Sequence, residues 1–108
     1  MDTKNQNKIQ IKDFLFFDNL AFYYLIQETP VALMAKALKS MDRKLANSIL
    51  SILTDKQKEI LSLAITLEKE SSESGQKALE GLSIIAQNLY EKGLIYKKGH
   101  YFYGKKKN

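Results

Sequence analysis

The 108-residue sequence predicts an all-α fold, a compact array of about six helices with a short C-terminal β-hairpin. Three helix starts follow one another in residues 29–69, with connectors of only a few residues. Helices joined by such short connectors must fold back and pack on one another. A further apolar stretch of helical periodicity covers residues 75–93, and β-type residues flank the segment 97–100.

Two helices are expected before the central block. Residues 1–8 have no apolar periodicity and predict a disordered arm. A short helix is expected within residues 11–17, and Asp18 or Asn19 offers an N-cap to a second helix over residues 20–28. Apolar side chains occupy nearly every side of that second helix, which indicates burial on more than one face.

The central block contains the three consecutive helix starts. Thr29 before Pro30 predicts an N-cap with proline at the first helical position. Ser40 and Asp42 are both suited to cap the next helix. Its apolar residues recur at three- and four-residue spacing and predict one buried face: Leu45, Ile49, Ile52 and Leu53.

The third helix of the block is expected to begin at Asp55. Thr54 and Gln57 have the spacing of a capping box, in which each side chain accepts a hydrogen bond from the backbone of the other. The last long helix is expected after the polar segment 70–75, with Ser74 as its N-cap.

The C-terminal part of the chain is expected to be a long helix followed by a hairpin. Gly93 is suited to end the helix, and Gly81 inside it predicts a close contact with another helix. Residues 94–104 favour a small hairpin. We therefore expect one domain over residues 9–104, followed by a basic tail at 105–108.

The composition argues against catalysis. Cysteine is absent, which excludes disulfides, thiolate nucleophiles and most zinc sites. His100 is the only histidine, and no glycine-rich phosphate loop, paired-carboxylate motif or nucleophile arrangement occurs. We therefore expect no enzymatic activity, no metal and no cofactor.

Charge and hydropathy limit the classes of partner and the cellular location that we expect. The formal net charge is +5, but three lysines at 105–107 leave only +2 for the rest of the chain. Arg43 is the only arginine, and arginine is the side chain best suited to bidentate contacts with bases, so nucleic acid is a disfavoured partner. No apolar run approaches the ~20 residues of a membrane span, and no signal sequence precedes the domain. A cytoplasmic protein without membrane insertion is expected.

An apolar stripe on the third helix of the block is the first candidate for partner binding. Lys56, Leu63 and Leu67 fall within about 40° of one another when drawn at 100° per residue. If this side is exposed, it would bind a partner or a second copy of the chain. The alternative is that a neighbouring segment, such as the C-terminal hairpin, covers it.

A basic group is the second candidate, formed by Lys36, Lys39 and Arg43, with Lys44 beside them. It would meet an acidic partner loop, where charge pairs mainly set the rate of approach and are screened by salt. The alternative is an ordinary solvated face.

The order and spacing of several segments point to a known family. These are KDFLFFDN at 12–19, LIQET at 25–29, Ala37-Leu38-Lys39, NSILSILTDKQKEILSLAI at 47–65 and the helix end from Leu89 to Gly93. Over residues 11–95 the chain resembles the C-terminal domain of the flagellar motor switch protein FliG. The resemblance implies an all-helical rotor domain without catalytic residues, whose charged helix meets the cytoplasmic loop of the stator.

The family's functional charges carry over only in part. Lys39 and Lys56 stand where the family has basic residues, whereas Leu63 and Ala64 stand where it has an acidic pair. The family's next arginine falls near 71–72, where this chain has serines. The resemblance therefore implies a motor-switch domain, or an accessory or diverged version of it. Its expected place is the cytoplasmic face of the motor, peripheral to the membrane, with stator or rotor proteins as partners.

Two other functions remain open. Residues 89–103 resemble the end of a recognition helix followed by a basic wing, as in a small winged-helix nucleic-acid-binding protein, although residues 69–77 lack the apolar helix such a fold needs. The second open function is that of a structural homodimer whose two copies meet through Leu63 and Leu67. The domains that precede this one in the motor protein are missing, so the chain is a fragment or a stand-alone relative, and Met1 favours the latter.

Overall fold

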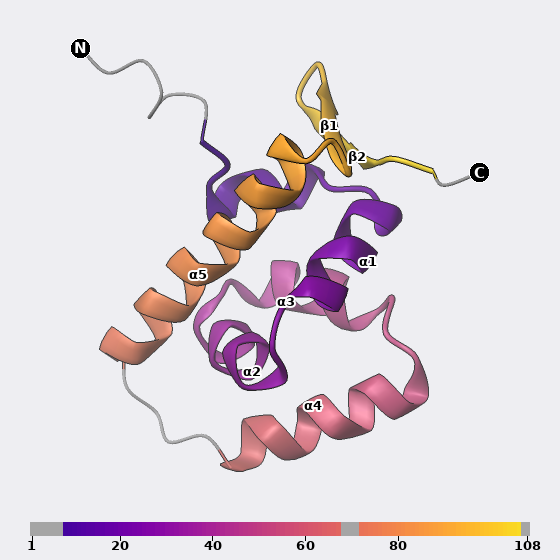
Figure 1. Cartoon of the computed structure of the whole chain (residues 1–108). Helices are drawn as coiled ribbons and strands as arrows, with labels where there is room; N and C mark the ends of the chain where they lie inside the picture. The colour runs from indigo at the N-terminus through magenta and orange to yellow at the C-terminus, as the bar shows by residue number, and fades with distance from the viewer. Residues whose placement is uncertain (1–7, 68–71, 107–108) are drawn as a thin grey trace.

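The computed structural model describes residues 8–67 and 72–106, in which the chain forms six helices and one hairpin (Figure 1). In chain order the elements are η2 (Ile11–Phe16), a 3₁₀ helix, α1 (Asn19–Glu28), α2 (Val31–Ser40), α3 (Arg43–Leu50), α4 (Asp55–Leu67), α5 (Ser72–Glu91), β1 (Ile95–Lys98) and β2 (Tyr101–Gly104). The predicted class, a compact helical array with a C-terminal hairpin, is confirmed. Most of the predicted arm and the last two residues of the predicted tail lie outside the described residues.

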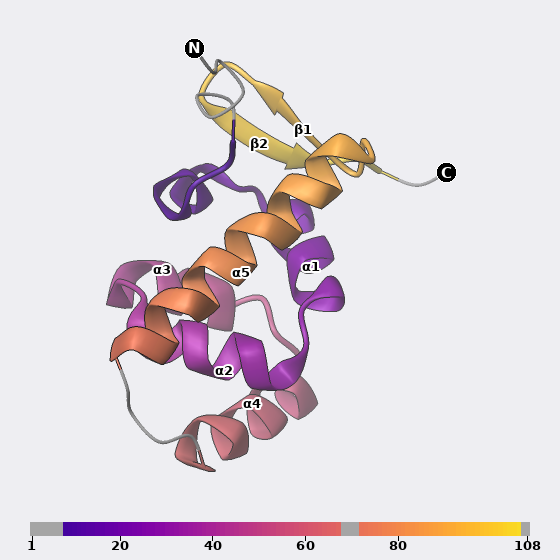
Figure 2. The same cartoon turned by 60° about the vertical axis from the view of Figure 1, so that its left-hand side comes forward.

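Helix α5 extends from α2 to the hairpin and packs against other elements along its length. It packs against α2 near its start, against α1 and η2 farther on, and against β1 at its end. Helix α4 packs chiefly on α2. The hairpin and α4 consequently lie at opposite ends of the molecule (Figures 1 and 2).

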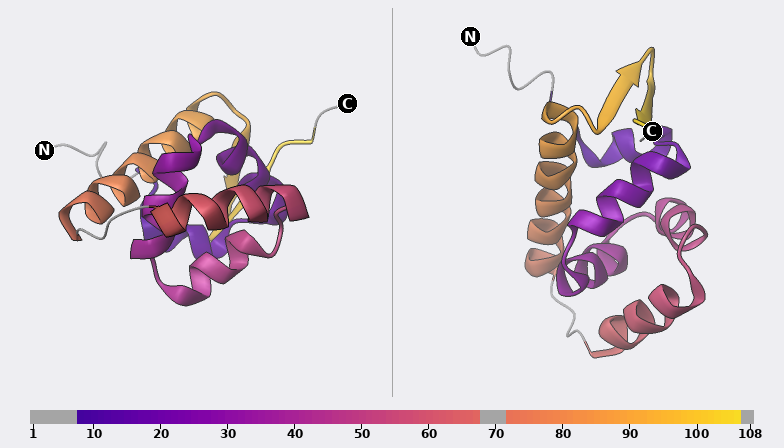
Figure 3. Two further views of the ribbon diagram at one scale, coloured as in Figure 1. Left: turned by 90° about the horizontal axis from the view of Figure 1, so that it is seen from below. Right: turned by 45° about the vertical axis from the view of Figure 1, so that its right-hand side comes forward.

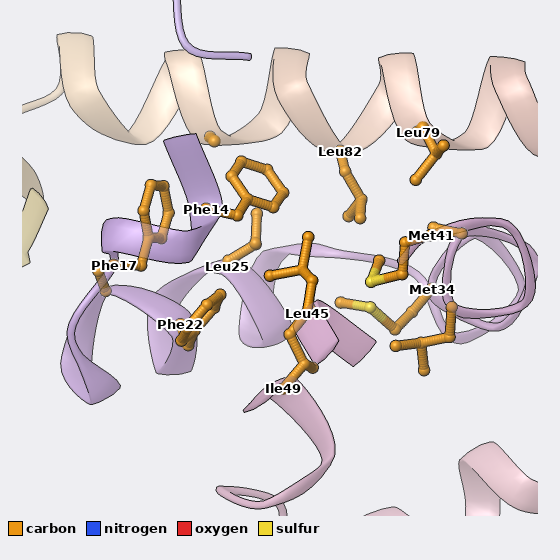
Figure 4. Close-up of a cluster of buried hydrophobic side chains, with 14 of the residues drawn as sticks. Phe14, Phe17, Phe22, Leu25, Met34, Met41, Leu45, Ile49, Leu79 and Leu82 are labelled. Carbon is orange, nitrogen blue, oxygen red and sulfur yellow. The ribbon is translucent and has the colours of Figure 1, made fainter. Parts of the chain in front are cut away.

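The core forms between α5 and the helices that it crosses (Figure 4). Near the hairpin it is aromatic: the ring centroids of Phe14 and Phe17 are 4.8 Å apart, and those of Phe17 and Phe22 are 5.4 Å apart. Toward α2 the core is aliphatic, with Met34 and Leu82 almost fully buried. Burial of these side chains supplies the main favourable term in folding.

Two of the predicted N-caps form as expected. The Asp18 carboxylate accepts a hydrogen bond from the Ala21 backbone N–H at 2.8 Å and starts α1. The Asp42 carboxylate accepts one from the Lys44 N–H at 3.0 Å and starts α3. Each side chain satisfies a backbone donor that a helix leaves without an internal partner.

The predicted cap at Thr29 is wrong. Thr29 ends α1 instead of starting α2: its hydroxyl donates a hydrogen bond to the Leu25 carbonyl at 2.6 Å. Helix α2 begins one residue later than expected, with Pro30 at the N-cap position and no side-chain cap. Because Thr29 is buried, its hydroxyl takes the nearest carbonyl of the preceding turn.

The long helix ends as predicted but begins earlier. Because α5 starts at residue 72, the predicted cap Ser74 lies inside its first turn, and the prediction of that cap is wrong. At the other end, Gly93 has φ +83° and the Leu94 N–H donates to the Leu89 carbonyl at 3.0 Å. This is the hydrogen bond of a Schellman motif, which requires the left-handed conformation that glycine adopts readily.

The hairpin closes through a two-residue turn, Gly99 and His100. Gly99 has φ +66°, and His100 has a negative φ, which together identify a type II′ turn. The hairpin is tied to the helices by the Asp18 N–H, which donates to the Phe102 carbonyl at 2.9 Å. A parallel bridge between Phe17 and Phe102 makes the chain before α1 a third extended segment beside β2.

Candidate functional site

The start of α4 is fixed by the predicted capping box. The Thr54 N–H donates to Gln57 Oε1 at 2.9 Å, and the Gln57 N–H donates to Thr54 Oγ1 at 3.1 Å. Helix α4 therefore begins at Asp55, as predicted. Fixing the first turn also fixes which side chains of α4 turn toward α2 and which turn away.

Helix α4 buries only a small part of its surface. Among its side chains Leu61 alone is fully buried, and Ala64 and Ile65 are half-buried against the core. Figure 3 shows α4 at the rim of the molecule, and its extensive contacts are with α2. The remaining sides of this helix face outward.

The outward side of α4 carries a line of large apolar residues. Ile60 is 44% exposed, Leu63 62% and Leu67 73%. We call these three residues the α4 face. Their spacing of three and then four residues is that of a coiled-coil seam, so they form one narrow stripe along the helix. Lys56 is exposed one turn before Ile60 and extends the same line.

The structure places the first predicted group as the helical geometry requires. Lys56, Leu63 and Leu67 are all exposed on α4. The hairpin, which was the expected cover, packs instead on α1 and α5 at the other end (Figure 1). Ile60, which the predicted group did not include, belongs to the same stripe, since it lies three residues before Leu63 and is exposed.

The second predicted group is spread over two helices. Lys36 and Lys39 are half-buried and lie three residues apart on α2, hence on neighbouring positions of one side. Arg43 is exposed at the first position of α3, after the break at Met41. That these three side chains act as one basic surface stays a prediction.

A cluster of aromatic side chains on the hairpin was not predicted from the sequence. Tyr96 and Tyr103 stack with ring centroids 5.7 Å apart and an interplanar angle of 25°. Phe16 meets Tyr101 edge to face, with centroids also 5.7 Å apart. The pattern of aromatic residues was visible in the sequence, but the strand register that brings them to one face was not.

In residues 8–67 and 72–106 no group of three or more histidines, aspartates or glutamates is placed to hold a metal ion. None of the helices that the structure describes has the length and apolar character needed to cross a membrane.

Comparison of the chain with family models, curated proteins and solved structures found no match. The line of exposed apolar residues makes the α4 face the candidate site for a protein partner.

Proposed function

We propose that the chain is a non-catalytic protein-interaction domain of the flagellar motor switch type, which binds a rotor or stator component through the α4 face. The observation that carries this proposal is the line of three exposed apolar residues on α4, a helix that buries only a small part of its surface. Exposed apolar stripes of this kind mark sites where a partner helix or loop docks.

The family resemblance and the position of Leu63 support the same conclusion. Leu63 stands where the resembling family carries an acidic residue, and it points outward, whereas the adjacent Ala64 is half-buried. The partner surface would thus be the same helix face, with the charge contact replaced by an apolar one. Burying the exposed parts of the α4 face would contribute about 3 kcal/mol before the costs of association.

Charged residues would then guide the approach to the partner. Lys56 flanks the α4 face, and Lys39 lies on α2, the helix on which α4 packs. Such charges mainly raise the rate of encounter with an acidic loop and lose their effect as salt is added. The proposed location is the cytoplasm, at the cytoplasmic face of the motor.

The test measures binding of the purified chain to the cytoplasmic loop of the stator protein and to the rotor proteins of the same cell. Leu63→Asp and Leu67→Asp are each expected to weaken binding by about tenfold or more, because each places a charge in an apolar contact. Ile84→Asp is the matched control: Ile84 is also 62% exposed but lies on α5. Its affinity should equal that of the wild type.

Two results would remove the proposal. In the first, the chain binds none of the rotor or stator components at low salt. The other is an equal loss with Ile84→Asp, which would show a general effect of the added charge. Lys39→Glu and Lys56→Glu test the steering charges separately, and we expect them to slow association more than they speed dissociation.

A further inference from the structure

The strand register gathers aromatic residues on the outer face of the hairpin. Tyr96 pairs with Tyr103, and Lys98 pairs with Tyr101. Paired residues share a face, and the alternation along each strand puts these four opposite the buried Ile95 and Phe102. We call Tyr96, Lys98, Tyr101 and Tyr103 the tyrosine face.

Phe16, the last residue of η2, extends this face beyond β2. The parallel bridge joins the next residue, Phe17, to Phe102, and this brings Phe16 close to Tyr101 in β2. The edge-to-face contact between Phe16 and Tyr101 agrees with this placement. Phe16, Tyr96 and Tyr101 are all exposed, at 40%, 47% and 54%.

The open end of the hairpin is fixed by three hydrogen bonds. The Gly104 N–H donates to the Asp18 carboxylate at the start of α1 at 3.0 Å, and the Lys105 N–H donates to the Leu94 carbonyl just before β1 at 2.8 Å. The Lys105 carbonyl in turn accepts a hydrogen bond from the Tyr24 hydroxyl. A platform whose rings are already in place loses little conformational entropy when a flat ligand stacks on it.

The segment that carries the hairpin is basic. Residues 92–106 contain no aspartate or glutamate. They contain five lysines, all exposed: Lys92, Lys97, Lys98, Lys105 and Lys106. Lys98 lies on the tyrosine face itself, whereas Lys97 pairs with Phe102 on the opposite face. Cations spread around exposed rings suit a ligand that combines planar groups with a chain of negative charges.

From this combination we infer that the tyrosine face binds single-stranded nucleic acid. Unpaired bases stack on the exposed rings while the phosphates contact the surrounding lysines. A duplex does not offer the faces of its bases, and direct reading of base pairs favours bidentate arginine contacts, whereas the only arginine, Arg43, lies on α3. Recognition is therefore expected to tolerate many sequences. The inference is independent of the proposed function because α4 lies at the opposite end.

The test uses fluorescence anisotropy with an end-labelled oligouridylate of about 12 nucleotides, a length that spans a stacking site of this size. Tyr96→Ala and Tyr101→Ala are each expected to weaken binding by about tenfold, and Tyr96→Phe to keep it, because the ring supplies the stacking. Tyr23→Ala is the matched control, since Tyr23 is 48% exposed but lies on α1. Thermal melts of each variant check that the domain stays folded.

Salt and competing ligands complete the test. Raising the salt from about 50 to about 200 mM is expected to weaken binding by about tenfold, as for two or three phosphate contacts. Leu63→Asp should leave the affinity for the oligonucleotide unchanged, so that this inference and the proposed function fail separately.

Several outcomes would overturn the inference. The absence of oligonucleotide binding at low salt is one, and affinity that is unchanged in both alanine variants is another. Equal or tighter binding of a DNA duplex of the same length would favour a winged-helix mode instead. Binding to vesicles that contain phosphatidylserine, without binding to the oligonucleotide, would assign the face to an anionic membrane.

Discussion

At the residue scale, Asp18 is the side chain on which two elements depend. Its Oδ1 accepts hydrogen bonds from the Ala21 N–H at 2.8 Å and from the Gly104 N–H at 3.0 Å. One carboxylate therefore starts α1 and fastens the end of β2. Gly104 permits this close approach, because a Cβ there would lie 2.7 Å from the Leu20 carbonyl carbon and 2.8 Å from the Ala21 nitrogen.

Asp18→Ala is expected to lower the free energy of unfolding by about 2 kcal/mol, since it removes a cap and leaves two part-buried N–H groups without their acceptor. Asp18→Asn keeps an acceptor oxygen and should cost only about 1 kcal/mol. Urea unfolding followed by circular dichroism measures both, through the midpoint at a constant m-value. An alanine variant as stable as the wild type would show that water replaces the carboxylate at no cost.

The local nature of a cap explains which starts were predictable. The caps at Asp18, Asp42 and Thr54 join residues at most three positions apart, so the sequence contains all that is needed to identify them. The Thr29 hydroxyl has two possible local roles: it can cap the start of α2, or it can donate to the Leu25 carbonyl of α1. Its burial, which depends on how the helices pack, decided between them.

At the element scale, two glycines have different roles: Gly81 lies inside α5, and Gly93 follows the end of this helix. Gly81 fulfils the predicted close contact: a Cβ there would lie 3.3 Å from Leu33 Cδ2 of α2. Gly93 has nothing within 4 Å of such a Cβ, but its φ is +83°. Space at Gly81 is thus limited only by the end of a side chain, whereas Gly93 is required by its backbone conformation.

These roles predict different effects for the same substitution. Gly93→Ala should lower the free energy of unfolding by about 1 to 2 kcal/mol, because an L-residue is strained in the left-handed region. Gly81→Ala should change it by less than about 0.5 kcal/mol, since the gain in helix propensity offsets the displacement of Leu33. Thermal unfolding of the two variants, measured side by side, is the comparison. The reverse order would contradict both assignments.

At the scale of the whole molecule, the two candidate surfaces differ in how far the sequence predicted them. That Leu63 and Leu67 share a side follows from helical geometry alone. That they are exposed follows only from the hairpin packing at the other end of α5. Predicting the tyrosine face would have required more information than this. The face depends on the pairing of Tyr96 with Tyr103 and on a third segment from the start of the chain.

The extent of the α4 face also bears on whether the chain pairs with itself. Helix α4 has 13 residues, so it is about 20 Å long, and its exposed apolar line has three side chains. A stable dimer usually buries about 800 Å² on each partner, well beyond what one such line provides. We therefore expect the isolated chain to be a monomer in sedimentation experiments at micromolar concentrations.

The same experiment separates a homodimer from a docking face. If the sedimentation coefficient rises with concentration in the wild type and stays constant in Leu63→Asp, the α4 face is a contact between two copies of the chain. If both proteins remain monomeric while Leu63→Asp loses a motor component, the face is free to receive that partner. The exposed leucines then remain uncovered until the partner arrives, because the apolar line is too short to hold a second copy yet long enough to add affinity to a larger interface.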